Sequence, residues 1–411
     1  MSDKKKKPEA IQLVTVPESE FTIVHPREDV HCARVPLAGC AWIDTGEGVV
    51  LIDTLLHPWA AEKTLENIHE TGGKVEYIIY THHHLDHING CKVFMADQPR
   101  AVISHHYLPS NLDKYKMLAQ HRARIAAQQF NIPEIPNSGD NWVYPTQTFL
   151  EEMSFSLGGK TFELYAARGE TDDVCWVWVP EIKTAFLGDL IIRSFPNIGN
   201  PWKPTRFALD WAKTLEQVRT MQPELIIAGG ANIDFHCEEA LQALDDNIAA
   251  IRSLHDQVVA CINRGIHISE MIHQIQLPDE LKKSPYLKFG YSRPEFFVYN
   301  TYRWYHGYFD GNPANLLPRP EKEVKITLCD LIGDSNKIID KALSLSADGR
   351  AQLALQVLDV LLQADPDNIE ARKTRIELLE KLVEDDFCVM SRNSYVYFMQ
   401  QDKEFIEARS K

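Results

Sequence analysis

Short apolar runs separated by turn residues dominate the first part of the chain. Between residues 21 and 54 these runs are rich in β-branched residues and follow one another as FTIV, VHCARV, AGCAWID and GVVLID. Such spacing predicts a meander of β-strands that opens a sheet. Residues 57–70 instead place apolar side chains at helical spacing, with Pro58 in the first turn, and predict a helix that ends at Gly72 and Gly73.

The same alternation of strand and helix patterns continues beyond residue 99. It predicts a strand at residues 100–106, a helix at 111–129 and a loop rich in Pro and Asn at 131–145, which is a candidate lid. Two further pairs of strands are predicted around the turns at residues 158–159 and 180–181. These elements together predict an α/β domain.

The second part of the chain has the hydrophobic period of helices. Residues 238–281 are helical by this criterion, and their last part, GIHISEMIHQIQLPDEL, predicts a helix, a turn and a helix. From residue 350 two amphipathic helices are predicted on either side of residues 365–367, as one repeat-like hairpin rather than a repeat array. We therefore predict a flexible tail at residues 1–20, an α/β domain at 21–236 and a helical domain at 237–411.

Composition and charge narrow the classes of protein. With 411 residues, of which 44% are hydrophobic and 25% charged, the chain is long enough for two or three domains with buried cores. Its net charge of −15 argues against nucleic acid as a partner. No apolar run approaches the length of a membrane span, and none follows the lysines at residues 4–7, so we expect neither anchor nor signal peptide. The cytoplasm is the expected compartment, and eight cysteines without a C-x-x-C pair fit reduced thiols there.

A cluster of histidines follows the apolar run of residues 75–80, which is β-branched and predicts a buried strand. In THHHLDHING alternate residues of an extended turn point the same way, so His82 and His84 can share one ion, while Asp86 and His87 can reach a second position. Imidazole and carboxylate are the ligands that a borderline divalent metal accepts. A polar surface turn is the alternative, but the spacing directly after a strand favours a metal site.

This stretch resembles the signature of the metallo-β-lactamase superfamily, whose αββα sandwich binds one or two metals through H-x-H-x-D-H. The resemblance implies that Asp53, at the end of VVLID, supports the metal loop from behind. It places the third ligand in the loop RGETDD, which contains no histidine, so Glu170 is the expected ligand, and it makes Asp189, at the end of KTAFLGD, the bridging carboxylate. The alternatives are a turn carboxylate, a surface acid and a helix N-cap, respectively. His83 is expected to lie behind the ligands or at the surface.

A glutamate in the third ligand position resembles the alkylsulfatase branch of the superfamily. Residues 302–318, YRWYHGYFDGNPANLLP, are similar to the alkylsulfatase dimerisation domain, and the helical hairpin after them also has its counterpart there. The resemblance implies a catalytic αββα sandwich followed by an all-α dimerisation domain, and hence a homodimer. Alkylsulfatases then carry a sterol-carrier-like domain that helps to hold the alkyl chain. This sequence ends at Lys411 without it, so a substrate with a long alkyl chain is less expected.

Two positions depart from the pattern that the resemblance implies. The last metal histidine is replaced in LIIAGGANID by Gly229 and Gly230, which leaves the second metal position short of a ligand. His236 follows a few residues later and is a candidate additional ligand, or alternatively a residue near the start of the next helix. The histidine that protonates the leaving group in alkylsulfatases is missing from RSFPN, where only Asn197 resembles the pattern.

Positive charge for a substrate anion is then left to other side chains of the same region. The candidate contacts are Arg193, Lys203 and Arg206, together with Asn197. Arginine is permanently protonated and lysine nearly so unless it is buried, so none of the three cations is a general acid at neutral pH by composition alone.

These observations predict a metal-dependent hydrolase in which a metal-bound hydroxide attacks an ester-like substrate, such as an alkyl or aryl sulfate, with Asp86 as the catalytic group that orients the water. A di-iron or di-manganese redox enzyme is the alternative, because Asp86, Glu170 and Asp189 make a hard, anionic ligand set. A non-catalytic binding protein is a further alternative. We expect two divalent ions, zinc first and iron or manganese next, a small-molecule substrate, and no membrane or nucleic-acid partner.

Overall fold

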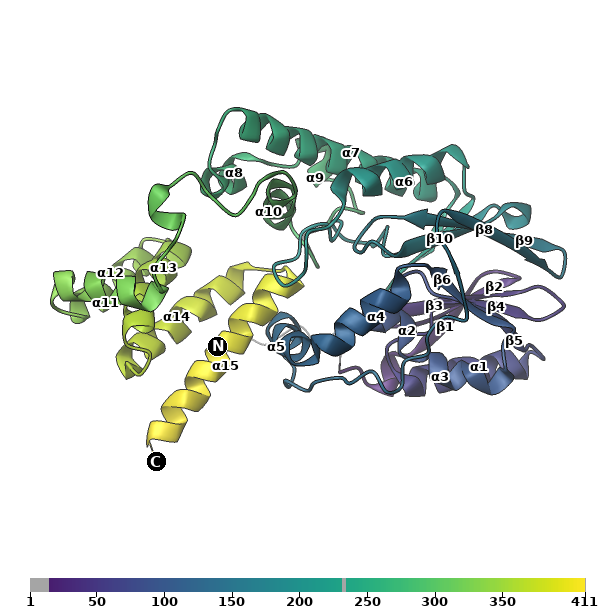
Figure 1. Ribbon diagram of the computed structural model, residues 1–411, viewed down its shortest axis with the longest axis horizontal. Helices are drawn as coiled ribbons and strands as arrows, with labels where there is room; N and C mark the ends of the chain where they lie inside the picture. The colour runs from purple at the N-terminus through teal and green to yellow at the C-terminus, as the bar shows by residue number, and fades with distance from the viewer. Residues whose placement is uncertain (1–14, 231–233, 411) are drawn as a thin grey trace, which may run out of the picture. The chain divides into compact units, whose positions relative to one another are not determined.

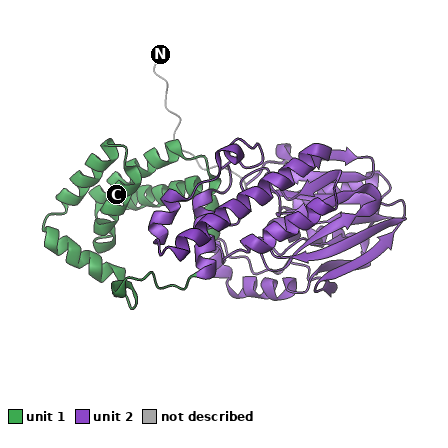
Figure 2. Cartoon of the chain, turned by 90° about the horizontal axis from the view of Figure 1, so that it is seen from above, with its two compact units in different colours: residues 1–12, 124–134, 306–411 green, residues 13–123, 135–305 purple. Residues whose placement is uncertain are grey.

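The computed structural model describes residues 15–230 and 234–410, so most of the predicted tail at residues 1–20 lies outside the described residues. The chain forms two compact units (Figure 2), which we call the α/β unit, residues 13–123 and 135–305, and the helical unit, residues 1–12, 124–134 and 306–411. The last strand ends at His236, and a helix begins at Cys237. That a domain boundary lies there stays a prediction.

Two sheets form the centre of the α/β unit. The first has seven strands in chain order, with antiparallel pairing as far as β4 and parallel pairing from β4 to β7. Its strands are β1 (Thr22–Arg27), β2 (Val30–Val35), β3 (Ala38–Asp44), β4 (Val49–Ile52), β5 (Val75–Ile79), β6 (Ala101–His105) and β7 (Gln147–Phe149).

The second sheet has six strands in the order β13-β12-β11-β10-β9-β8, and only β11 and β12 pair in parallel. Its strands are β8 (Glu152–Leu157), β9 (Lys160–Ala167), β10 (Val174–Val179), β11 (Thr184–Gly188), β12 (Leu225–Ala228) and β13 (Asp234–His236). The meander, the strand at residues 100–106 and both later strand pairs are therefore present as predicted.

Helices cover the outer face of each sheet, as Figure 1 shows for α1 (Pro58–Glu70) and α3 (Cys91–Phe94) on one side and for α6 (Ala208–Thr220) and α7 (Cys237–Asn263) on the other. Strand β3 shows how the sequence divides its side chains between layers. Ala41 and Ile43 belong to the core between the sheets, whereas Trp42 belongs to the core beneath α1. This period of two produces an αββα sandwich, the predicted fold class.

The remaining helices of the α/β unit lie in two stretches of the chain. The first contains α2 (Leu85–Ile88), α4 (Leu108–Met117) and the start of α5 (Ala119–Phe130), and the second contains α8 (Ile268–Gln274), α9 (Asp279–Lys282) and α10 (Pro294–Tyr305). The prediction of one helix at residues 111–129 was wrong, because the backbone of Leu118 leaves the helical region between α4 and α5. Side chains of α7 and α10 complete the core of the sandwich, which explains why the α/β unit continues to residue 305.

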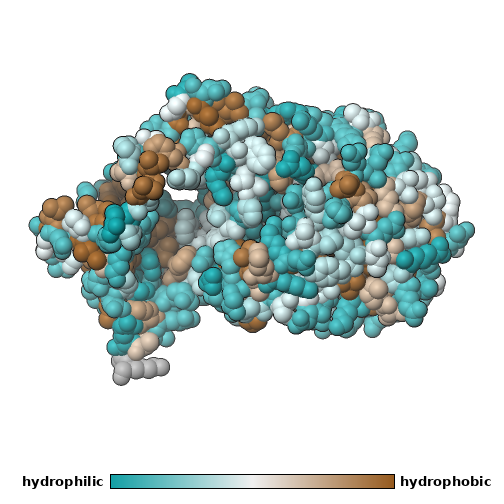
Figure 3. Space-filling model, in the orientation of Figure 1, coloured by the Kyte–Doolittle hydropathy of each residue, from teal (hydrophilic) through white to brown (hydrophobic). Residues whose placement is uncertain are grey.

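Five helices make up most of the helical unit. They are α11 (Glu321–Ile332), α12 (Asn336–Ala347), α13 (Ala351–Ala364), α14 (Ile369–Asp385) and α15 (Val389–Ser410). The predicted hairpin corresponds to α13 and α14, and Asn368 caps α14 by accepting a hydrogen bond from the backbone N–H of Ala371. Helix α11 exposes Val324, Leu328 and Leu331 at helical spacing, and Figure 3 shows hydrophobic side chains at the surface there.

Candidate metal centre

The predicted metal loop begins two residues after β5 and ends in α2. The backbone of His84 is extended, with φ −62° and ψ 146°, and His82 and His84 face the same ligand group. The backbone is fixed from both sheets: Cys175 N–H on β10 donates to the carbonyl of Thr81 at 2.7 Å, and Thr54 N–H donates to the carbonyl of His87 at 2.7 Å. The loop is therefore built into the edge of the sandwich at which β4, β5 and β11 end.

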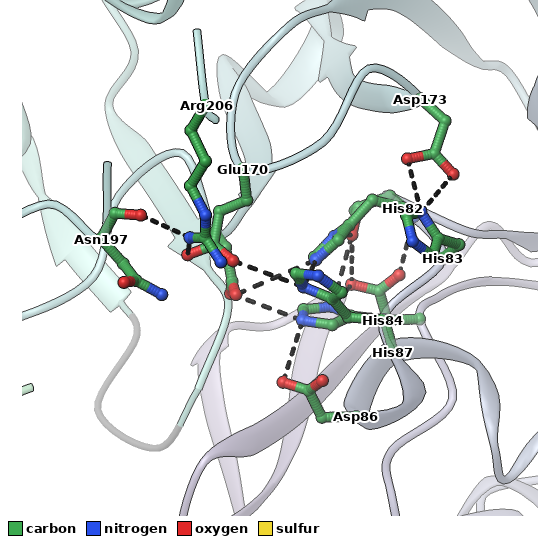
Figure 4. Close-up of polar contacts among 12 residues, drawn as sticks. His82, His83, His84, Asp86, His87, Glu170, Asp173, Asn197 and Arg206 are labelled. Carbon is green, nitrogen blue, oxygen red and sulfur yellow. Dashed lines mark hydrogen bonds and ion pairs between the residues drawn. The ribbon is translucent and has the colours of Figure 1, made fainter. Parts of the chain in front are cut away.

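One group of ligand atoms contains His82, His84, Glu170 and Asp189, all within 4.8 Å of one another. His82 Nε2 lies 2.9 Å from His84 Nδ1, and Glu170 Oε2 lies 3.3 Å from the same Nδ1 (Figure 4). Ligands of a tetrahedral ion with bonds near 2.1 Å stand about 3.4 Å apart. The four side chains thus have the chemistry and the spacing to hold a divalent ion.

A second group contains Asp86, His87 and Asp189, again within 4.8 Å. His87 Nε2 lies 3.3 Å from Asp86 Oδ2 and 3.4 Å from Asp189 Oδ1. The other oxygen of Asp189, Oδ2, is 4.0 Å from His82 Nε2 in the first group. Asp189 therefore turns one carboxylate oxygen to each group, as a bridging ligand must.

Asp53 fixes the orientation of His87 from behind. Its Oδ2 lies 2.7 Å from His87 Nδ1, and its two oxygens accept hydrogen bonds from the N–H and hydroxyl of Thr81, both at 2.8 Å. Nδ1 of His87 therefore faces Asp53, and Nε2 is the nitrogen that faces the second ligand group. Nε2 is buried and has no hydrogen-bond partner within residues 15–230 and 234–410. A buried, unpartnered nitrogen aimed at two carboxylates fits a metal ligand.

The same loop turns His83 away from both groups. Its Nδ1 lies 2.9 Å from both carboxylate oxygens of Asp173, and both residues are buried. Burial alone raises the pKa of Asp173, but the imidazole of His83 more than reverses this and lowers it. His83 therefore lies behind the ligands rather than at the surface, the two positions that the spacing left open.

Glu170 has an ionic partner that the sequence did not indicate. Arg206 Nη1 lies 2.6 Å from Glu170 Oε1, and the two side chains are 1% and 5% exposed. Arg206 also donates to the backbone carbonyl of Asn197 (Figure 4). Arg206 was a candidate contact for a substrate anion, and the structure instead places its guanidinium against a candidate metal ligand.

Burial and mutual charge set the protonation of the centre. Burial, and then the neighbouring imidazoles, lower the pKa of His82 and His84, which favours the neutral form that binds metal. Burial opposes the charge of Asp86, but the imidazole of His87 lowers its pKa to about 2. Burial raises the pKa of Glu170 and of Asp189, and the negative charge of neighbouring carboxylates raises both pKa values further.

The structure gives a steric reason for one of the two glycines in place of the last histidine. A Cβ at Gly229 would stand 2.0 Å from Asp189 Oδ1, and Gly229 N–H donates to the carbonyl of Gly188 at 2.6 Å. No side chain fits there while Asp189 keeps its position. His236 lies 3.2 Å from Asp234 with a side chain 48% exposed, and it is in neither of the two ligand groups found among the described residues.

The other candidate anion contacts lie in different surroundings. Arg193 forms an ion pair with Glu239 at 2.8 Å and donates to the carbonyl of Asp234. Lys203 has no ion pair within 4 Å among the residues that the structure describes, and it is one cause of the lowered pKa of His84. Burial, together with Arg206 and Arg122, lowers the pKa of Lys203 to about 8. Lys203 is thus a cation near the candidate ligands without a counter-ion of its own.

Two family models match consecutive parts of the chain. The metallo-beta-lactamase superfamily matches residues 39–230, and the alkyl sulfatase dimerisation family matches residues 267–404. None of the described helices is both long and apolar enough to cross a membrane.

Alkylsulfatases are among the relatives found both by sequence and by structure. The chain is 22% identical to a linear primary-alkylsulfatase of a Pseudomonas strain, over 86% of this chain and 72% of that one, and 21% identical to an alkyl/aryl-sulfatase of Saccharomyces cerevisiae, over 86% and 59%. A stereoselective inverting sec-alkylsulfatase from Pseudomonas superposes with a TM-score of 0.82 at 21% identity, over 94% of this chain and 66% of that one. The chain thus spans between about three-fifths and three-quarters of these relatives. The chain thus contains a metallo-beta-lactamase domain, matched over residues 39–230, followed by an alkyl sulfatase dimerisation domain, matched over residues 267–404.

Proposed function

We propose that this protein is a metal-dependent hydrolase that cleaves sulfate esters of alkyl or aryl alcohols into the alcohol and sulfate. The observation that carries the proposal is the pair of ligand groups that share Asp189 at the edge of the sandwich. The kinship with alkylsulfatases supports the substrate class.

In this proposal His82, His84, Glu170 and Asp189 hold one divalent ion, and Asp86, His87 and Asp189 hold the other. Bound divalent ions lower the pKa of water and neutralise charge on the substrate. Asp86, whose carboxylate is ionised at neutral pH, would orient the attacking water. Asp53 keeps His87 in the tautomer that leaves Nε2 free.

We propose that Lys203 and Asn197 contact the sulfate group. Lys203 brings a positive charge that has no ion pair within residues 15–230 and 234–410, and Asn197 lies beside the Glu170–Arg206 pair. Arg193 is the less suitable contact, since Glu239 and Asp234 already accept its hydrogen bonds. A lysine whose pKa is about 8 is also a better proton donor to a leaving oxygen than an exposed one.

The test combines metal analysis with product analysis. Protein purified without added metal is assayed for zinc, iron and manganese by elemental analysis, and then incubated with alkyl sulfates of increasing chain length and with an aryl sulfate. We expect about two ions per chain, zinc before iron or manganese, and release of sulfate that ion chromatography detects. Bound metal without sulfate release from any ester would contradict the substrate class, and redox-active iron with visible absorption would favour the redox alternative.

We also propose that the protein forms a homodimer, since the alkyl sulfatase dimerisation family matches residues 267–404. The apolar side chains that α11 exposes in this segment suit a surface that a second copy covers. Leu328→Glu should then shift the protein from dimer to monomer in sedimentation, whereas Lys325→Glu on the same helix should not. A wild-type protein that is monomeric at micromolar concentration would rule the dimer out.

We propose the cytoplasm as the compartment, because all eight cysteines are free and six of them are buried.

A further inference from the structure

We infer that Arg206 is a positioning residue of the metal centre, which makes Glu170 a ligand through one oxygen only and offsets one of the negative charges gathered there. The inference rests on the proposed metal centre and is independent of the substrate.

The geometry divides the two carboxylate oxygens of Glu170 between two partners. Oε1 lies 2.6 Å from Arg206 Nη1, and Oε2 lies 3.3 Å from His84 Nδ1 in the first ligand group. A free carboxylate can turn about its last bond and offer either oxygen or both. The guanidinium removes this freedom, because Oε1 is engaged and Oε2 is left facing the histidines.

Arg206 can impose this orientation because its own position is fixed. Its side chain is 1% exposed, and Nη1 also donates to the carbonyl of Asn197. Its backbone N–H donates to Asn300 Oδ1 at 2.7 Å, and its backbone carbonyl accepts from Asn300 Nδ2 at 3.1 Å. Asn300 lies on α10, so a helix that packs on the sandwich core holds the arginine in place.

Charge gives a second reason for the pair. Three carboxylates, those of Asp86, Glu170 and Asp189, lie in the two ligand groups, and each is near another. In the region around them Arg206 is the cation that pairs directly with a ligand. A neutral imidazole in place of Glu170 would need no such counter-ion, and it would leave the buried guanidinium unpaired, which is strongly unfavourable.

The mutual dependence of Arg206 and Glu170 can be measured with a double-mutant cycle. We expect Arg206→Met to weaken binding of the first ion by about 10- to 100-fold, the usual effect of losing a residue that orients a metal ligand. Glu170→His should also weaken it, because the guanidinium of Arg206 is then left unpaired. The double variant, with a neutral ligand and no arginine, should recover to within about tenfold of the wild type. Arg206→Lys keeps the charge but not the planar fork, so its affinity should fall between wild type and Arg206→Met. Competition with a chromophoric chelator and elemental analysis measure these affinities without reference to activity.

A matched control is available on β2 of the same unit. Arg34 pairs with Asp234 at 2.5 Å, with side chains 11% and 27% exposed, and neither residue belongs to a ligand group. Arg34→Met should lower stability and leave metal affinity unchanged, which separates a general loss of a buried pair from the specific effect.

The outcomes are distinguishable. Wild-type affinity in Arg206→Met, or a double variant that binds no better than Glu170→His, would overturn the inference while leaving the metal centre intact. A wild-type protein that binds no divalent ion would overturn the metal centre itself. If Arg206→Met does not fold, the comparison of Glu170→His with the double variant still decides, because only a specific pairing predicts that removing Arg206 improves Glu170→His.

Discussion

Each unit contains a cluster of buried charge, and the two clusters differ in how far cations compensate the buried carboxylates. In the helical unit the carboxylate of Asp402 is 0% exposed and is bonded by Arg372 at 2.5 Å and by Arg375 twice at 2.6 Å. Two cations saturate one anion, and the cluster ties α14 to α15. In the α/β unit three carboxylates lie in the two ligand groups, and Glu170 pairs with Arg206. Nε2 of His87 is buried there without a hydrogen-bond partner among the described residues.

The difference separates a structural ion cluster from one arranged for a ligand. Unpaired buried charge is costly, so a cluster that serves stability alone is expected to satisfy itself. The excess of anionic and imidazole groups at the sandwich edge is satisfied when divalent ions bind. Stability and function are therefore separable by mutation, and each of the following experiments tests that separation.

Removal of a first ligand should have the largest effect. We expect His82→Ala or Asp86→Ala to lose at least one ion and to lower sulfate ester hydrolysis by at least about 1,000-fold, because bound ions contribute several kcal/mol to such reactions. The helical unit should stay folded by circular dichroism. His83→Asn is the matched control in the same loop, and it should retain both ions since His83 faces Asp173. Full metal content in both ligand variants would sink the assignment.

A substitution in the helical unit tests the ion cluster formed by Asp402, Arg372 and Arg375. Asp402→Asn leaves two partly buried arginines beside a buried neutral amide, so the free energy of unfolding should fall by about 3–5 kcal/mol, the usual consequence of breaking a buried pair. Metal content of the folded protein should not change. Denaturant unfolding and elemental analysis on the same sample check both expectations. A stability loss below about 1 kcal/mol would show that the two arginines find other partners.

A third substitution alters the centre without touching a proposed ligand. In Asp53→Asn the amide can donate to His87 Nδ1, which favours the tautomer with its proton on Nε2 and blocks that nitrogen. We expect binding of the ion held by Asp86, His87 and Asp189 to weaken by about 10- to 100-fold. The ion held by His82 and His84 should respond less. An equal loss at both positions would mean that Asp53 supports the whole loop through Thr81 and not His87 in particular.

The sequence predicted those parts of the centre that depend on local spacing. His82, His84, Asp86 and His87 lie in one stretch of six residues that follows β5, so an extended turn followed by α2 is enough to bring them together. The pairing of Arg206 with Glu170 was not predictable, because Arg206 lies 36 positions after Glu170, beyond β10 and β11, and no periodicity links the two residues. Arg193, Lys203 and Arg206 looked equivalent as cations, and only the folded chain gives them different partners.

In the fold, too, the sequence predicted what depends on local spacing and not what depends on distant contacts. Strand alternation predicted the sheets, but the role of α7 as a cover of the sandwich depends on contacts with distant strands. Helices α11, α12 and α15 were not predicted either. The exposed apolar side chains of α11 blur its amphipathic pattern, since a helix that faces both its own unit and a proposed second copy has no single polar face.

The smallest expected effect concerns the difference between the two metal positions. The first has four candidate ligands and the second three, so the second remains open to water or substrate and should hold its ion less tightly. We expect dialysis against a mild chelator to strip one ion first, with affinities that differ by at least about tenfold, or about 1.4 kcal/mol.

Gly229→Ala sharpens this last prediction. Its Cβ would stand 2.0 Å from Asp189 Oδ1, the oxygen that faces His87, while Oδ2 faces His82. The variant should therefore release the weaker ion more readily and change the tighter one less. His236→Ala is the complementary variant: it should leave both affinities unchanged, because His236 pairs with Asp234. Equal loss of both ions from the wild type, together with a weakened second ion in His236→Ala, would mean that His236 moves in to complete the second site.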